Sequence, residues 1–303
     1  MGFRSKYWGV KAVSKLKTFD PRNNFYIFSD PRGGSTWLAE LIQAVPSSAI
    51  LWEPLHLEYN RIFRDLGFQW RQYIPEDEAW VEARKAFDRH FEGKEWNIFS
   101  SQMTYFSDLL FAERLLVKIC RGNRLLPWLT KQYEFKYKPI YMIRHPFAVV
   151  DSQLKQGGWD ANWKSFKLPD SPYVDFELKH ADFLGSLESK EELLTANWCI
   201  SNKQTLENVR HGVDWINVKY ESLFLNPEDN LKIIFDQWNL ELPDKIDFSK
   251  NSRTSLGTYT KDKMKQLSKW KTHFDSQQID QMLRVVDYFQ IKQYSDAVLP
   301  EIC

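Results

Sequence analysis

The stretch FYIFSDPRGGSTWLAELI, residues 25–42, decides the predicted fold. Its apolar and aromatic beginning, residues 25–28, predicts a buried strand, and the segment from residue 36 has the apolar spacing of a helix. Between them, Gly33 and Gly34 can adopt backbone angles that are closed to other residues and let a ligand approach the main chain. The N-terminus of a helix carries unpaired N–H groups and a partial positive charge. We therefore expect an anion-binding turn here, to which Arg32 adds a cation and Ser35 and Thr36 add hydroxyls.

Strand and helix patterns alternate along the rest of the chain. Further apolar runs predict strands at residues 49–52, 115–119, 139–143 and 213–218. Helical patterns occupy residues 36–45, 124–133, 146–156 and 227–238, and an amphipathic helix is expected at 276–289. The alternation predicts an α/β fold with a central, largely parallel sheet and helices on both faces.

Two stretches fit this alternation poorly. Residues 58–113 contain helical segments but many charged and aromatic residues, and residues 157–190 contain Gly, Pro and aromatic residues without clear periodicity. Long loops on such sheets often carry function, so both are interpreted as insertions that cap a substrate site. Because no linker or internal repeat is visible, we expect residues 1–303 to form a single domain.

Composition narrows the class of protein. The 303 residues contain 41 Lys plus Arg against 40 Asp plus Glu, a net charge of +1, which argues against proteins that bind nucleic acid or membranes through bulk charge. No apolar run approaches the roughly 18–20 residues of a transmembrane segment. The odd, widely spaced cysteines Cys120, Cys199 and Cys303 indicate a reducing compartment, so we expect a cytoplasmic protein. Neither the cysteines nor the six histidines have the spacing of metal ligands, and no metal is expected.

A second strand-to-helix corner lies in KPIYMIRHPFAVVDSQLKQ, residues 138–156. Pro146 suits the first position of a helix. Arg144 ends the strand, and Ser152 follows two helical turns later, so both could contact one phosphate. Taken singly, Arg144 could equally form a surface ion pair, and Ser152 could be a solvated helix position.

Other interpretations of the first turn remain open. The two glycines could simply make a tight turn, with Ser35 capping the helix. A nucleotide triphosphatase or kinase would need the motif GxxxxGK[ST], whose Lys reaches the terminal phosphates. Here that Lys is missing and the cation, Arg32, precedes the glycines.

The run PRGGSTWL, residues 31–38, resembles the 5′-phosphosulfate-binding loop of the sulfotransferases that use 3′-phosphoadenosine 5′-phosphosulfate (PAPS), in particular the bacterial and carbohydrate-type branch. The resemblance implies a P-loop-like three-layer fold, PAPS as co-substrate, 3′,5′-adenosine bisphosphate (PAP) as product and no metal. It makes Arg32 the catalytic cation. It also implies that the donor is held by Arg32, Gly33, Gly34, Ser35, Thr36 and Trp37 at its 5′ end and by Arg144 and Ser152 at its 3′-phosphate.

A third segment, residues 251–274, is similar to the part of this family that folds over the adenine and the 3′-phosphate, above all in its run SKWKTHF. The resemblance implies that Arg253 and Lys271 add charge near the 3′-phosphate and that Ser255 adds a hydrogen bond. Solvated basic residues ahead of an amphipathic helix are the alternative.

The general base is open. Cytosolic members of the family use a His after a mid-chain strand, and the corresponding residues 117–121 contain none. The run LWEPLH, residues 51–56, is similar to a Glu-Pro-Leu of the carbohydrate-type enzymes, which makes Glu53 the first candidate and His56 the second. Glu53 could instead pair with an Arg, and His56 could be a packed residue.

The resemblance implies transfer of a sulfuryl group to a hydroxyl or amine of a small-molecule, sugar or lipid acceptor, with no nucleic-acid partner. The alternative is a protein of the same fold that binds PAPS or PAP without catalysis. The sequence does not specify the acceptor or the oligomeric state.

Overall fold

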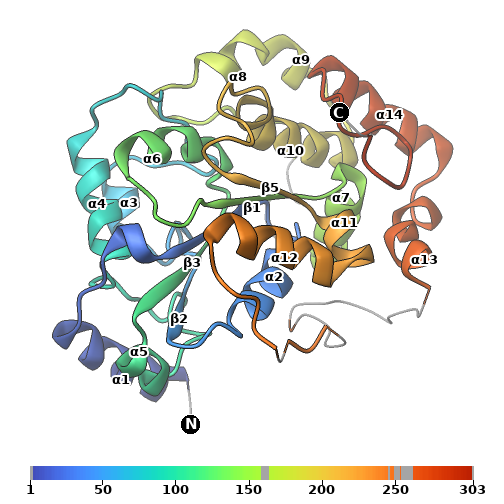
Figure 1. The fold of residues 1–303 in the computed structure, drawn as a ribbon. Coiled ribbons are helices and arrows are strands. Elements are labelled where there is room, and N and C mark those ends of the chain that lie inside the picture. Colours follow the sequence, from blue (N-terminus) through green and yellow to red (C-terminus); the bar gives the residue numbers. More distant parts are fainter. Residues whose placement is uncertain (1–2, 158–163, 245, 249–252, 254–261, 302–303) are drawn as a thin grey trace.

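A five-stranded parallel sheet forms the centre of the computed structural model, which describes residues 3–157, 164–244, 246–248, 253 and 262–301 (Figure 1). The strand order is β2-β3-β1-β4-β5, and every neighbouring pair is parallel. The strands are β1 (Phe25–Ser29), β2 (Ser48–Trp52), β3 (Arg114–Cys120), β4 (Ile140–Ile143) and β5 (Ile216–Lys219). The predicted α/β fold with a parallel sheet is confirmed.

Both faces of the sheet are covered, because successive side chains of a strand point to opposite sides. In β1, Tyr26 and Phe28 pack into one apolar core, while Phe25 and Ile27 pack into the other. All five residues of β1 are buried, which explains why the strand is continuously apolar rather than alternating.

Helices form the two outer layers (Figure 1). The core on the Phe25 face takes its helical residues from α2 (Ser35–Ile42), α11 (Tyr220–Leu225), α12 (Pro227–Trp238) and α13 (Lys263–Leu267). The core on the Tyr26 face includes residues of α1 (Phe3–Leu16), α3 (Arg61–Asp65), α4 (Val81–Phe91), α5 (Phe106–Phe111), α6 (Leu126–Gln132), α7 (Pro146–Gln156), α9 (Ala181–Gly185), α10 (Lys190–Leu206) and α14 (Ser276–Tyr288). The remaining helical segments are α8 (Asp175–Lys179), η1 (Pro21–Asn23), η2 (Asn123–Leu125) and η4 (Lys269–Thr272).

The predicted helices at 146–156 and 227–238 are confirmed with the same bounds as α7 and α12. The helix predicted at 124–133 instead starts as the 3-10 turn η2 and becomes α6 at Leu126, with Pro127 in its first turn. The strand predicted from residue 213 starts at Ile216, because residues 210–214 form a turn held by the Arg210 carbonyl, which accepts from the Val213 and Asp214 amides.

The sheet topology positions the ligand site. In the sheet, β1 lies between β3 and β4. The chain leaves β1 toward β2 on the β3 side and later crosses from β3 to β4 on the other side, so the connections diverge above the carboxyl end of β1. In open parallel sheets this divergence point is where ligands bind. The predicted insertion at 58–113 contains α3, α4 and α5, and the one at 157–190 contains α8 and α9.

Within the described part of the chain, no helix combines the length and apolarity needed to cross a bilayer.

Candidate functional site

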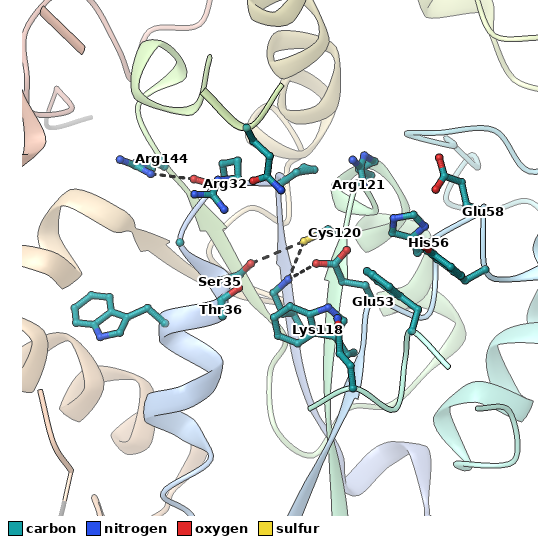
Figure 2. Close-up of a pocket in the computed structure, with 18 of the residues that line it drawn as sticks. Arg32, Ser35, Thr36, Glu53, His56, Glu58, Lys118, Cys120, Arg121 and Arg144 are labelled. Carbon is teal, nitrogen blue, oxygen red and sulfur yellow. Dashed lines mark hydrogen bonds and ion pairs between the residues drawn. The ribbon is translucent and has the colours of Figure 1, made fainter. Parts of the chain in front are cut away.

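The two predicted strand-to-helix corners lie in direct contact. An Nη1 proton of Arg144 is donated to the Arg32 main-chain oxygen at 3.0 Å. The Nε proton of Arg32 is donated to Ser152 Oγ at 2.8 Å, although 120 residues separate the two in sequence. Figure 2 shows Arg144 linked to the Arg32 turn beside the start of α2, where Ser35 and Thr36 lie. Arg32, Arg144 and Ser152, which the sequence predicted to share one ligand, are therefore neighbours.

The turn after β1 needs both of its glycines. Gly34 has a φ of 95° in the left-handed region, and a Cβ there would lie 2.3 Å from Cδ2 of Tyr220. A Cβ on Gly33 would lie 2.3 Å from Ser29 Oγ and 2.9 Å from the Asp30 carbonyl oxygen. The side chains of Tyr220 and Ser29 and the Asp30 carbonyl therefore leave no room for a Cβ at either glycine. The first amides of α2 are thereby held at the mouth of the turn.

Two guanidinium groups meet at these corners without an ion-pair partner in the described structure, although the charge of Arg144 acts on the buried carboxyl of Glu221. Among the described residues, neither Arg32 nor Arg144 takes part in an ion pair. Burial and the neighbouring charge of Arg144 lower the pKa of Arg32. The Nε atom of Arg144 is buried with no hydrogen-bond partner in the described structure, and its guanidinium lies 4.4 Å from the centre of the Tyr220 ring. Since a partly buried cation without a paired carboxylate is costly, this arrangement suits an anionic ligand.

A small basic cavity of about 110 Å³ adjoins the two corners. Arg32, Arg144 and Ser152 line it together with two lysines that the sequence analysis missed, Lys155 and Lys269, and with the acidic Asp151. Lys155 lies one turn beyond Ser152 on α7 and binds Asp151 at 2.8 Å. Lys155 could have been predicted from its position three residues after Ser152, because residues three apart lie on the same face of a helix.

The third predicted segment contributes differently from expectation. Lys269 rather than Lys271 lines the small cavity; Lys271 is exposed, with its Nζ 5.2 Å from the Trp270 ring centre. Arg253 lies beside Glu40 of α2, at an Nε–Oε1 distance of 3.5 Å, and lines neither cavity. Ser255 lies outside the described residues.

A larger cavity of about 400 Å³ continues from the same corners. Arg32, Arg144 and Tyr220 line both cavities, so the two are contiguous. The larger cavity is also lined by the predicted residues Gly34, Ser35, Thr36, Trp37, Glu53 and His56 and by residues not predicted, Glu58, Tyr59, Phe99, Gln102, Lys118, Cys120 and Arg121. In Figure 2, Lys118 and Glu53 lie at the centre of the site, between Arg32 and His56.

Glu53 is held by a buried lysine. Its Oε1 accepts from Lys118 Nζ at 2.6 Å, and the same Nζ lies 3.1 Å from Cys120 Sγ. Burial acts to raise the pKa of Glu53, but the charge and the hydrogen bond of Lys118 outweigh it, so the pKa lies below its ordinary value. Burial also raises the pKa of Cys120 to about 11, which keeps it a thiol. Glu53 is thus a paired carboxylate with weakened basicity.

His56 differs from Glu53 in forming no ion pair within the described part of the chain. Its ring packs among Tyr59, Trp70 and Phe99, at centroid distances of 5.0, 5.3 and 4.4 Å. Burial and the charge of Arg121 lower its pKa below the ordinary 6.5. Its Nδ1 is buried without a hydrogen-bond partner among the described residues. A neutral imidazole with a free ring nitrogen can accept a proton near neutral pH.

Strained backbone gathers at this site. Eight non-glycine residues of the described structure have positive φ, and three of them, Arg32 (69°), Glu53 (41°) and Arg121 (60°), line the larger cavity. Glu53 and Arg121 directly follow β2 and β3, and Arg32 lies three residues beyond β1. Such conformations persist where the surroundings enforce them, which is typical of functional sites.

No protein-family model matches the chain, and no curated protein matches it in sequence. Similar solved structures include the sulfotransferase domain of the Synechococcus PCC 7002 olefin synthase, with 19% identity, a TM-score of 0.46 and coverage of 89% of this chain and 95% of that one. The sulfotransferase domain from the curacin biosynthetic pathway has 19% identity, a TM-score of 0.44 and coverage of 88% and 96%. Mouse sulfotransferase SULT7A1 complexed with PAP has 15% identity, a TM-score of 0.44 and coverage of 98% and 94%. All three structures are named as sulfotransferases or sulfotransferase domains.

Proposed function

We propose that this chain transfers a sulfuryl group from PAPS to a hydroxyl or amine of an acceptor bound in the larger cavity. The single observation that carries the proposal is the contact between the two corners, through Arg144 with the Arg32 carbonyl and Arg32 with Ser152. One nucleotide with phosphate at both its 3′ and 5′ positions fits such a pair of adjacent, unneutralised cations. The proposal includes one domain, with the segments 58–113 and 157–190 capping the acceptor.

The residues present fit this donor. The glycine turn and the N-terminus of α2 suit the 5′-phosphosulfate, because they offer main-chain amides and exclude side chains. Arg144, Ser152 and the lysines of the small cavity suit the 3′-phosphate. In the structure, Ser152 Oγ accepts the Nε proton of Arg32. When the donor binds, the phosphosulfate would replace Ser152 as the partner of Arg32, which leaves Ser152 to contact the 3′-phosphate. The buried, unpartnered Nε of Arg144 supplies a further donor for the phosphate.

Arg32 supplies the main electrostatic stabilisation. In an in-line displacement at sulfur the acceptor oxygen or nitrogen forms the new S–O or S–N bond while the S–O bond to the phosphate breaks, so negative charge grows on the departing phosphate. A fixed guanidinium at that position stabilises this charge in the transition state. Arg32 stays protonated at neutral pH, because even a lowered arginine pKa remains far above 7, and it acts through charge alone.

His56 is the better candidate for the base that removes the acceptor proton. Glu53 came first from sequence resemblance, but its carboxylate is occupied by Lys118 and its pKa is lowered. His56 lines the same cavity, burial and the charge of Arg121 favour its neutral form, and no ion pair among the described residues occupies its ring. In this scheme Glu53 keeps Lys118 charged and in place, and Lys118 adds a second cation at the centre of the site.

The acceptor side favours a partly apolar molecule. Trp52, Tyr59 and Phe99 line the larger cavity, and the Tyr59 and Phe99 rings stack 4.7 Å apart at an interplanar angle of 1°. Aromatic walls with a few polar groups are typical of sites for small organic ligands. A hydroxyl compound with an apolar or sugar-ring face fits this lining.

Turnover of radiolabelled PAPS with a panel of hydroxyl and amine acceptors tests the proposal. We expect Arg32→Ala to lower turnover by roughly 10²-fold or more, the scale of losing one transition-state donor. Arg22→Ala is the matched control, because Arg22 is exposed and pairs only with Asp20 in the described structure. Wild-type turnover by Arg32→Ala would refute its role. Tight PAP binding without turnover of any acceptor would favour a donor-binding protein instead.

A further inference from the structure

Helix α1 exposes an apolar stripe to solvent. Trp8 is 63% exposed and Leu16 is 86% exposed, and exposed Ala12 lies between them at helical spacing. The opposite side of the helix is buried through Val10 and Val13. Burying large apolar residues stabilises a fold, so a helix that turns Trp8 and Leu16 outward has a second apolar face without a described partner.

Helix α5 extends this apolar surface. It packs against α1 at one corner of the molecule (Figure 1). Its residues Phe106, Leu110 and Phe111 are 45%, 47% and 75% exposed. The two helices are joined by Lys17, whose Nζ donates to the Leu110 carbonyl at 2.8 Å. We call the exposed residues Trp8, Ala12, Leu16, Phe106, Leu110 and Phe111 the α1–α5 surface.

Positive charge surrounds the α1–α5 surface. Residues 6–17 contain four basic residues and no acidic one: Lys6, Lys11, Lys15 and Lys17. Lys94 lies beside them, with its Nζ donating to the Lys17 carbonyl at 2.8 Å. Two acids lie nearby. Asp108 caps α5, accepting from the Tyr105 amide at 2.9 Å, and the exposed Glu113 lies close enough to Lys17 to act on its charge while it contacts Arg114. The chain's net charge of +1 hides this local excess.

We propose that the α1–α5 surface docks onto an anionic lipid bilayer. An interfacial helix combines Trp, Phe or Leu on one face with Lys or Arg at its edges, and it binds through buried apolar area plus attraction to anionic headgroups. Trp8, Leu16 and Phe111 supply the apolar contacts, and Lys11 and Lys15 flank the stripe on the same helix. Nucleic acid would use the lysines but leave these large apolar side chains in water.

The docking surface is separate from the site. The two lie close to each other: Gln102 lines the larger cavity, and its carbonyl accepts from Nζ of Lys6 on α1 at 2.5 Å. None of the residues of the α1–α5 surface lines either cavity. Membrane binding can therefore be measured without PAPS, and its failure would leave the proposed transferase function untouched.

Vesicle co-sedimentation of the full chain tests the proposal. We expect binding to vesicles of phosphatidylcholine plus phosphatidylglycerol, and much weaker binding to phosphatidylcholine alone. The double variant Lys11→Gln/Lys15→Gln should weaken binding roughly 25-fold, because each lysine near a charged bilayer contributes about a fivefold gain in affinity. Trp8→Ser/Leu16→Ser should also weaken it, because the inserting side chains are lost.

The matched control is Lys190→Gln/Lys232→Gln, which removes the same charge from two exposed positions on α10 and α12. It should bind the anionic vesicles like the wild type. Equal loss in this control would show a non-specific charge effect and overturn the proposal. So would the absence of any binding to anionic vesicles, or a dimer in size-exclusion chromatography that Trp8→Ser/Leu16→Ser abolishes while vesicles are ignored.

Discussion

Two buried carboxyl groups at neighbouring corners of the site have opposite electrostatics. Asp30 follows β1, where burial raises its pKa to about 6 and a hydrogen bond from the Asn202 amide at 2.6 Å offsets this only in part. Glu53 follows β2, where burial also acts to raise its pKa, but Lys118 more than compensates and leaves it lowered. The difference lies in the partner, an amide for Asp30 and an ammonium for Glu53.

This contrast distinguishes the part of the site proposed to bind the donor, which we call the donor corner, from the part around Glu53, Lys118 and His56, which we call the acceptor corner. At the donor corner, by which we mean the two turns around Arg32 and Arg144, Asp30 accepts hydrogen bonds from the neutral amides of Asn202 and Asn123. The cations Arg32 and Arg144 form no ion pair in the described structure. The acceptor corner neutralises its own charges through the Glu53–Lys118 pair. One corner is therefore prepared for an anion, whereas the other holds its groups in fixed protonation states.

The largest expected effect tests the acceptor corner. We expect His56→Ala to lower kcat by roughly 10²- to 10⁴-fold, the usual contribution of a general base, with PAP affinity unchanged. Because burial and Arg121 lower the pKa of His56, the acid limb of the wild-type kcat/KM profile should have its midpoint below pH 6.5. If Glu53→Gln abolishes turnover and His56→Ala does not, Glu53 is the base.

The next effect concerns the buried pair itself. Lys118→Met should lower the free energy of unfolding by about 3–5 kcal/mol, because it leaves the Glu53 charge buried without its partner. Glu53→Gln/Lys118→Met should recover much of that loss, since neither charge remains. Urea unfolding of the two single variants and the double variant measures the coupling. Additive losses would contradict the pairing of Glu53 with Lys118.

Asp30 should produce a pH dependence of opposite sign to that of Glu53. Its folded pKa of about 6 lies above the unfolded 3.8, so its contribution is fully present below pH 3.8 and is lost as pH rises through 6. The lost stability is at most roughly 3 kcal/mol. Asp30→Asn should remove this slope when unfolding is measured between pH 4 and 7. Parallel curves for the variant and the wild type would contradict the raised pKa.

The lowered pKa of Glu53 acts the other way, because its stabilisation is present above pH 4.5 and lost below it.

The smallest expected effect is a loss of stability that tests the close packing of Tyr220 against Gly34. Gly34→Ala adds a Cβ 2.3 Å from Tyr220 at a positive φ, whereas Gly67→Ala meets nothing within 4 Å at a similar φ of 81°. Backbone strain is therefore common to both, and the clash belongs to Gly34 alone. Thermal unfolding should show Gly34→Ala about 1–3 kcal/mol less stable than Gly67→Ala, the range for overpacking. Equal destabilisation would mean that Tyr220 does not close the turn.

The donor corner could be predicted from the sequence because its features are local. Strand, glycine turn and helix are contiguous in residues 25–42, and the same order recurs in residues 138–156. Each corner is fixed by neighbours in the chain, so its motif survives in one short stretch. That the two turns lie close together could also be predicted, because parallel strands end at the same edge of a sheet.

The acceptor corner could not be predicted in the same way. Lys118 and Glu53 are 65 residues apart, and no local pattern marks a lysine inside a strand as buried and functional. The aromatic surroundings of His56 come from Trp70 and Phe99, far from it in sequence. The sequence also favoured Lys271 over Lys269, since both lie in a short basic run whose turn decides which side chain faces the cavity.

Calorimetric titration with PAP and with adenosine 5′-phosphate, both without Mg²⁺, tests the central claim most directly. The two ligands differ only in the 3′-phosphate, for which Arg144 and Ser152 are proposed partners. We predict that PAP binds at least roughly tenfold more tightly, as expected for one charged hydrogen bond or more, and that Ser152→Ala narrows the gap. Equal affinity for the two nucleotides, or no uptake of PAP, would contradict a shared site at the two corners.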